Sequence, residues 1–305
     1  MKKTSPLTAL ISAFGILVVA LSCTTPLTSK EKTDVEIDGL LGKVKSVRTS
    51  YGNGEYTKTM YDEYGYHVEQ LNYYHEEGRE LKTSCKNTYN KNNKLIEKSI
   101  YNSSGALKYQ VSYKYDEQGN NTEITTVDSR GQPNAKNIFV YDNRGNMVER
   151  CSYGASTDMP PYEKHSYTYD SRGNQVGGSS TSNSGRVTTN YHYEYDDKGN
   201  RTVQDTHYST PSGDGQAIWR FEYDEKGNIT KHSSLNPDGS IKEAVGYKYD
   251  NYGHQTEEHS INQGTESKST YQYSYDEQGN WIEKIYRDTT LGITETIKRE
   301  ITYYK

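Results

Sequence analysis

The sequence predicts an all-β fold, an antiparallel β-meander of tandem YD-type hairpin repeats that forms a curved or spiralling sheet. Three observations predict it. A short motif with the signature of a tight turn recurs along the chain, and aromatic residues alternate with polar ones before each copy. Tyrosine, with 31 residues, also replaces the aliphatic residues of an ordinary core. The strict repeat disfavours disorder, which is the alternative for so polar a chain.

The repeated motif is Y-D-x-x-G, as in YDEQGN at residues 275–280, and it occurs eight times. A ninth, degenerate copy at residues 89–93 carries Asn93 in place of the glycine, and one further step along the chain reaches Tyr303. Copies follow one another at intervals of 26 or 28 residues, an even difference that keeps the two faces of a strand in phase. The eight copies begin at Tyr61, Tyr115, Tyr141, Tyr169, Tyr195, Tyr223, Tyr249 and Tyr275.

Each repeat reads as two strands and two turns. Before the motif, aromatic residues stand at every second position, as at 191–195 and 271–275, which indicates a strand with one aromatic face. The D-x-x-G that follows is typical of a type I turn, in which Asp bonds the backbone and Gly accepts positive φ. We therefore assign a structural role to Asp116, Gly119, Asp142, Gly145, Asp170, Gly173, Asp196, Gly199, Asp224, Gly227, Asp250, Gly253, Asp276 and Gly279.

The N-terminus predicts a secretory signal. A basic start is followed by a predominantly apolar stretch at 7–21 and by small residues before Cys23. The tetrapeptide ALSC at 20–23 resembles the bacterial lipobox. This resemblance implies that Cys23 becomes the acylated first residue of the mature chain and anchors it to a membrane. Because no Asp follows Cys23, the same resemblance favours the outer membrane of the cell envelope, with the leaflet left open. An ordinary cysteine in a cleaved signal peptide is the alternative.

The chain divides into segments of different composition. We expect a lipoprotein signal peptide, a flexible tether rich in Thr, Ser, Lys and Glu, an aliphatic segment that caps the first edge of the sheet, and the repeat domain. Their bounds are 1–22, 23–34, 35–50 and 51–305.

The net charge and the alternation of residues along the strands limit the kinds of partner that we expect. The formal net charge is −5, and cleavage before Cys23 takes it to −7, with no basic stripe. Nucleic acid is therefore not an expected partner. Strands of outer-membrane barrels need an apolar outward face. The residues between the aromatic ones here are Lys, Glu, Gln, Ser and His, so we expect no barrel embedded in lipid.

Two cysteines remain in the mature chain after Cys23. Cys85 and Cys151 lie about five strands apart in a meander, which is roughly 24 Å at ~4.8 Å per strand. A disulfide spans at most about 7 Å between Cα atoms. The two could pair only if the sheet curled back on itself, so we expect free thiols.

The Y-D-x-x-G-N motif at this spacing resembles the YD repeat of the Rhs family, which includes toxin-complex shells and teneurins. The resemblance covers residues 51–305 and implies a spiralling β-sheet, which encloses a hollow shell in large members. Short members of the family imply no particular activity. With fewer repeats than those members, this chain is expected to enclose no sizeable cavity.

Motifs for chemistry are sparse. His254 and His259 are five residues apart, whereas the zinc motif H-E-x-x-H needs four on a helix. The single Asp of each turn lacks the ligand ladder of a calcium loop. We expect no metal, no cofactor and no catalytic residues.

Residues that depart from the repeat are the binding candidates, because packing does not require them. They are accompanied by two loops, 154–162 and 210–216, that are longer than their equivalents. The preferred hypothesis is a non-catalytic envelope lipoprotein that binds a glycan or protein partner. A structural or assembly scaffold of the outer membrane or periplasm that pairs through an open sheet edge, and a hydrolase, are the alternatives. The candidate binding residues are Trp219, Trp281, Tyr153 and Tyr162.

Overall fold

The computed structural model describes residues 32–76, 79–183, 188–262 and 264–305. They belong to one compact unit, Glu31–Lys305. The expected signal peptide and the lipid anchor at Cys23 lie outside the described residues.

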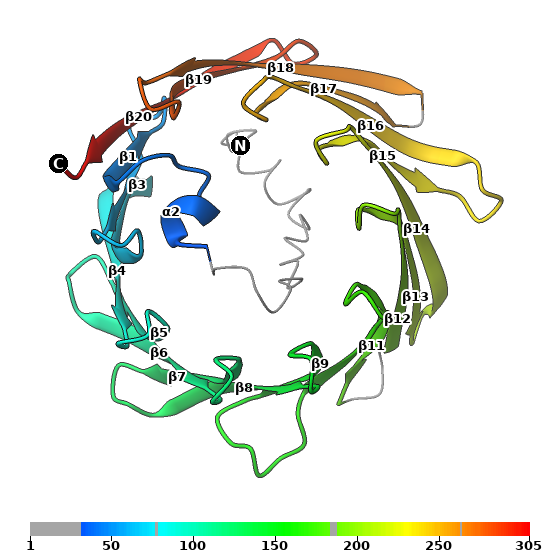
Figure 1. Cartoon of the computed structure of the whole chain (residues 1–305), viewed down its shortest axis with the longest axis horizontal. Coiled ribbons are helices and arrows are strands. Elements are labelled where there is room, and N and C mark those ends of the chain that lie inside the picture. The colour runs from blue at the N-terminus through cyan, green and yellow to red at the C-terminus, as the bar shows by residue number, and fades with distance from the viewer. Residues whose placement is uncertain (1–31, 77–78, 184–187, 263) are drawn as a thin grey trace. The chain divides into compact units, whose positions relative to one another are not determined.

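The repeat domain is a closed ring of antiparallel strands (Figure 1). Every strand pairs with its neighbour in sequence, and β1 also pairs with β20 through Val47 and Ile301, which closes the sheet into a 20-stranded barrel. The strands are β1 Val44–Ser50, β2 Tyr56–Tyr61, β3 His67–Glu76, β4 Arg79–Tyr89, β5 Leu95–Tyr101, β6 Leu107–Tyr115, β7 Asn121–Asp128, β8 Pro133–Tyr141, β9 Met147–Tyr153, β10 Glu163–Tyr169, β11 Gln175–Ser182, β12 Thr188–Tyr195, β13 Arg201–Thr210, β14 Gly213–Tyr223, β15 Ile229–Leu235, β16 Ile241–Tyr249, β17 Gln255–Asn262, β18 Thr265–Tyr275, β19 Trp281–Asp288 and β20 Ile293–Tyr303.

Closure corrects two expectations drawn from the sequence. The all-β antiparallel meander is confirmed, but the sheet is neither an open curve nor a spiral, because its first and last strands are hydrogen-bonded to each other. The expectation that so few repeats enclose no sizeable space is also wrong. Strands ~4.8 Å apart and tilted by roughly 40° close a 20-stranded ring about 40 Å across, wider than side chains fill.

The segment 35–50 joins the two ends of the sheet instead of covering a free edge. It contains the short helix α2, Asp34–Ile37, which lies on the inner side of the ring in Figure 1, and the strand β1. Thr33 caps the helix and forms a capping box with Glu36. The buried residues that hold this seam together, with Ile301 and Tyr303 packed against them, are Val35, Leu40, Val44, Val47 and Tyr61.

This seam identifies the two faces of the barrel. The segment inside the ring contacts Tyr61, whose hydroxyl donates to Asp38 at 2.6 Å, and packs on Val47. Side chains alternate along a strand, and paired residues on neighbouring strands share a face. The strand registers therefore extend the assignment of inner and outer faces from the seam to every strand of the ring. The tyrosine of each YD motif, with the residues two and four positions before it, faces the interior.

The YD turns form a belt at one rim of the barrel. At Asp142 the carboxylate accepts the backbone N–H groups of Arg144 and Asn146 at 2.9 Å and the Asn146 side-chain amide at 2.9 Å. Gly145 takes φ +82° and donates to the Asp142 carbonyl at 3.1 Å. The same backbone bonds occur at the other assigned turns, and the degenerate copy holds Asn93 at φ +60°.

The two cysteines lie on opposite faces of the barrel. Cys85 faces the interior, where its thiol is 4.0 Å from Gln70 Oε1, whereas Cys151 faces outward beside Glu149. Both are free thiols, as predicted. Within the described residues no helix is long and apolar enough to cross a membrane.

Candidate functional site

The interior of the barrel is lined by many aromatic rings. Most of the rings come from even-numbered strands, where the period-two pattern of the sequence places them on one face. Most are half-buried, so each ring keeps some accessible surface. Such amphipathic rings combine apolar area with a polar tip, which suits recognition of sugars or peptides. The lining includes Tyr113, Tyr115, Phe139, Tyr141, Tyr167, Tyr169, Tyr191, Tyr193, Tyr195, Trp219, Phe221, Tyr223, Tyr247, Tyr249, Tyr271, Tyr273 and Tyr275.

One part of the lining is an aromatic platform around His232, on β14 to β16. The His232 ring lies 5.6 Å from Trp219, 6.4 Å from Phe221 and 5.7 Å from Tyr247, measured between ring centroids. The Tyr247 hydroxyl is 3.2 Å from His232 Nδ1. Burial lowers the pKa of His232, so the imidazole is neutral at pH 7 and the platform is uncharged.

A second inward cluster lies on β9 and β10. Arg150 Nη2 is 3.2 Å from the Glu163 carboxylate and 2.8 Å from His165 Nε2. The His165 and Tyr167 rings are nearly parallel, with centroids 6.2 Å apart. Arg150 and Glu163 carry opposite charges and offset each other, which explains how charge is tolerated beside the aromatic lining.

The third inward group lies at the seam, where β19 and β20 meet β1. The Arg299 guanidinium carbon is 3.6 Å from the centroid of the Trp281 ring. Lys284 Nζ lies 4.7 Å from the Tyr271 centroid and 5.8 Å from that of Tyr273. Burial lowers the pKa of both Lys284 and Arg299, and the positive charge of Arg299 lowers the pKa of Lys284 further.

These two cations line a pocket of about 350 Å³. Its other walls come from the segment around α2 and from β1 and β2, so the pocket exists only because the sheet closes. Besides Lys284 and Arg299, it is lined by Asp38, Leu40, Val47, Thr49, Tyr51, Thr57, Thr59, Tyr61, Trp281 and Ile297.

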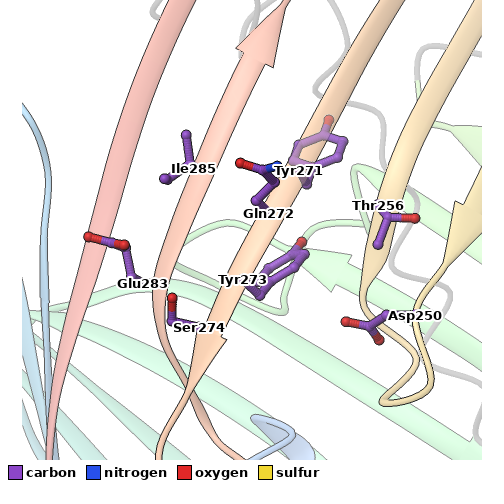
Figure 2. A pocket seen from close by; sticks show the side chains of 8 residues that line it. All are labelled: Asp250, Thr256, Tyr271, Gln272, Tyr273, Ser274, Glu283 and Ile285. Carbon is purple, nitrogen blue, oxygen red and sulfur yellow. The ribbon is translucent and has the colours of Figure 1, made fainter.

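A larger hollow, of about 540 Å³, lies over β17 to β19 (Figure 2). Figure 2 shows the Tyr271 and Tyr273 rings projecting from β18 next to Thr256 and Asp250. Gln272 alternates with these tyrosines and belongs to the opposite face of the sheet. Because the lining groups come from both faces, they do not converge on one point.

The outer face of the barrel carries ion pairs between neighbouring strands. Glu123 accepts Lys114 at 2.8 Å and Lys136 at 3.1 Å. Glu257 accepts Lys248 at 2.9 Å and Lys268 at 2.8 Å. The side chains of Lys114 and Lys248 are 68% and 71% exposed, so this face carries accessible charges.

The four predicted binding residues do not form one site. Trp219 and Trp281 face the interior but belong to separate groups, at His232 and at Arg299. Tyr153 pairs with Lys136 on the outer face, and Tyr162 is 49% exposed in the β9–β10 connection.

The two segments that the sequence predicts as long loops have different structures. Residues 154–162 are an irregular connection, but most of 210–216 continues β13 and β14, as shown by pairing of His207 with Gln216. The loop expected there is therefore a tight hairpin.

The sequence did not lead us to Lys284 and Arg299, the two positively charged residues at the seam. Arg299 stands four residues before Tyr303, in phase with the inward tyrosines of its strand. A charged residue at an aromatic-phase position is the signal that could have identified it. Lys284 carries no such signal, since it lies on a return strand and is placed inward by its pairing with Tyr273.

The histidines five residues apart do not converge. His254 lies 2.9 Å from the Tyr275 hydroxyl, and His259 lies 3.3 Å from Glu266 on the outer face. In the part of the chain that the structure describes, no group of three or more His, Cys, Asp or Glu side chains could hold a metal ion.

Comparisons with known proteins add no family. No family model matches the chain, and no curated protein matches it. Among solved structures, a TcdB2-TccC3-Cdc42 crystal structure aligns at 12% identity and a TM-score of 0.36, covering 88% of this chain but 16% of that one. A porin-like protein from Bacteroides uniformis aligns at 10% identity and a TM-score of 0.36, covering 85% of this chain and 98% of that one. Neither similarity is close enough to carry a conclusion about this chain.

Proposed function

We propose that this protein is a non-catalytic, lipid-anchored binding protein of the bacterial cell envelope, whose aromatic barrel interior holds a glycan. The observation that carries the proposal is the half-buried aromatic lining on one face of a closed sheet. Packing alone needs rings that are covered, whereas these rings keep exposed area directed at a space too wide for them to fill.

The polar outer face supports attachment by a lipid instead of immersion in one. Charged side chains such as Lys114 and Lys248 cover the outward positions. A lysine facing lipid destabilises a barrel by about 2–4 kcal/mol at the bilayer midplane. A chain of this kind therefore stays in water, and an acylated Cys23, as the lipobox resemblance implies, would hold it at the membrane surface.

A scaffold is the alternative, and one way for it to assemble is pairing with another chain through an open sheet edge. The closed ring does not favour that way of assembling. In this barrel β1 is hydrogen-bonded to both β2 and β20, so the ring presents no unpaired edge strand in the described residues.

A glycan array with the detergent-extracted full chain tests the binding role. Wild-type protein is expected to retain a defined set of glycans, and Trp219→Ala is expected to weaken retention of those that stack at the His232 platform. Tyr56→Ala is the matched control, because Tyr56 stacks on Tyr73 at 4.1 Å on the outer face. Retention of no glycan, or equal losses for both variants, would refute the proposal.

Membrane attachment has its own test. Cys23→Ala is expected to move the protein from the outer-membrane fraction to the soluble fraction. Protease treatment of intact cells then reports the leaflet, since only a surface-facing barrel is cleaved. A Cys23→Ala protein that fractionates like the wild type would contradict the lipid anchor.

A further inference from the structure

We infer that the seam pocket between Arg299 and Lys284 binds the carboxylate of an acidic sugar residue. The inference rests on the proposed function, glycan binding inside the barrel, and specifies the ligand class and the place.

Among the described residues, neither cation has a carboxylate within ion-pair distance, although the charge of Asp38 acts on Arg299 and opposes the lowering of its pKa. Arg299 and Lys284 form no ion pair and donate no side-chain hydrogen bond in the described part of the chain, and Arg299 Nε is a buried donor left unsatisfied. A buried donor without a partner is destabilising. Natural interiors rarely keep two such charges together unless something satisfies them, and an anionic ligand would do so.

The geometry of Arg299 suits a carboxylate. Stacking on Trp281 at 3.6 Å fixes the plane of the guanidinium and covers one of its faces. Arg299 lines the pocket, and the N–H groups at the edge of a guanidinium plane suit a carboxylate, which can accept two of them in parallel. Lys284 supplies a second positive charge on the neighbouring strand, where it pairs with Ile297.

Asp38 is the carboxylate that faces this pair, and it is already engaged. Its Oδ2 accepts the Tyr61 hydroxyl at 2.6 Å and lies 2.7 Å from His67 Nε2. The two positive charges of Arg299 and Lys284 exceed the single negative charge of Asp38, so the pocket has a net positive charge. The chain as a whole has a net charge of −5. The site therefore attracts an anion that the rest of the surface repels.

The remaining walls favour a sugar. Thr49, Thr57 and Thr59 line one side, and their hydroxyls have no hydrogen-bond partner among the described residues. Val47 and Ile297 provide apolar surface for a ring face. At about 350 Å³ the pocket lies at the small end of ligand sites, which limits it to a single sugar unit at a chain end or branch. A carboxylate, several hydroxyls and a compact ring describe a uronic or a sialic acid.

Calorimetry with the detergent-extracted full chain tests the inference. The probes are trigalacturonic acid and its methyl ester, and sialyllactose and lactose; each pair differs in a carboxylate, and the two pairs separate uronate from sialate. One acid is expected to bind at least about tenfold more tightly than its uncharged counterpart, since charged hydrogen bonds are the stronger kind. The difference should shrink at high salt.

Variants locate the site. Lys284→Gln and Arg299→Gln are expected to remove most of the preference for the acid. Arg299→Lys keeps the charge but lacks the guanidinium fork, so it should fold and still lose about tenfold. Arg287→Gln is the matched control: it removes one positive charge from the same strand, but on the outer face, where Arg287 donates to Gln272 at 2.6 Å. Thermal unfolding of each variant checks the fold.

The outcomes separate the two proposals. If charged and uncharged sugars bind equally, or if Lys284→Gln behaves like Arg287→Gln, the seam inference is overturned while glycan binding stands. If the array retains no glycan at all, the proposed function falls and the inference falls with it.

Discussion

The hydroxyl of Tyr115 donates a 2.7 Å hydrogen bond to the carbonyl oxygen of Leu95, the first residue of the return strand one repeat earlier. The next five YD tyrosines repeat this relationship at 2.7 or 2.8 Å, as with Tyr223 and Arg201. Each tyrosine therefore binds its repeat to the preceding one along the rim, in addition to the strand pairing. At the seam the pattern changes: Asp38 accepts the hydroxyl of Tyr61, which has no preceding repeat, and Asp34 accepts that of Tyr89.

Removing one of these hydroxyls should weaken the rim. Tyr223→Phe leaves the Arg201 carbonyl without the bond that it accepts at 2.7 Å. We expect a loss of about 1 kcal/mol in the free energy of unfolding, the typical net value of one hydrogen bond. Urea unfolding measures it. Tyr208→Phe is the control, because Tyr208 is 41% exposed and its hydroxyl has no partner in the described residues; equal losses would argue against the ladder.

The degenerate turn offers a test of backbone strain. Asn93 has φ +60°, in the region that glycine occupies at the other YD turns. Asn93→Ala should destabilise the protein by about 1 kcal/mol, whereas Asn93→Gly should change stability little, because glycine adopts this conformation without a steric penalty. Chemical denaturation compares the two with Asn92→Ala in the same turn. Identical effects of Ala and Gly at position 93 would contradict the prediction.

The outer ion pairs should make stability depend on acidity. Hydrogen bonds from Lys268 and Lys248 lower the pKa of Glu257 to about 2, from an ordinary value of 4.5. A folded-state pKa below the unfolded one contributes stability above pH 4.5, and this contribution is lost as the pH falls towards 2. Glu257→Gln should therefore lower the unfolding temperature at pH 6 and have little effect near pH 2. Glu277→Gln, in an exposed turn, is the control; a pH-independent difference for Glu257→Gln would count against the pairing.

Closure of the ring should depend on the packing of the seam. Val44 is 1% exposed and lies in the small buried cluster beneath α2. Val44→Ala removes two methyl groups, which destabilises a core by roughly 1.5 kcal/mol or more. Amide hydrogen exchange should accelerate first in β1 and β20. Val140→Ala, at a position that is 45% exposed on β8, should change neither stability nor exchange at the seam.

The sequence by itself determined the local structure. The D-x-x-G spacing predicted turns such as that of Asp142 and Gly145, because the backbone bonds and the positive φ depend on neighbouring residues alone. Period-two alternation predicted the strands and their aromatic face. The distance between Cys85 and Cys151 along the meander predicted free thiols. Of the binding candidates chosen from the sequence, Trp219 and Trp281 lie in the inward-facing groups of the structure, whereas Tyr153 and Tyr162 do not.

The tertiary structure decided what the repeats build. Pairing of Val47 with Ile301 joins residues from opposite ends of the chain, and it depends on twist and curvature summed over all the strands, which no single repeat encodes. Closure then made one face an interior, and it brought Asp38 from the α2 segment and Thr49 from β1 next to Arg299 from β20. A charged pocket assembled from both ends of the chain has no local sequence signature, because its residues meet only when the ring closes.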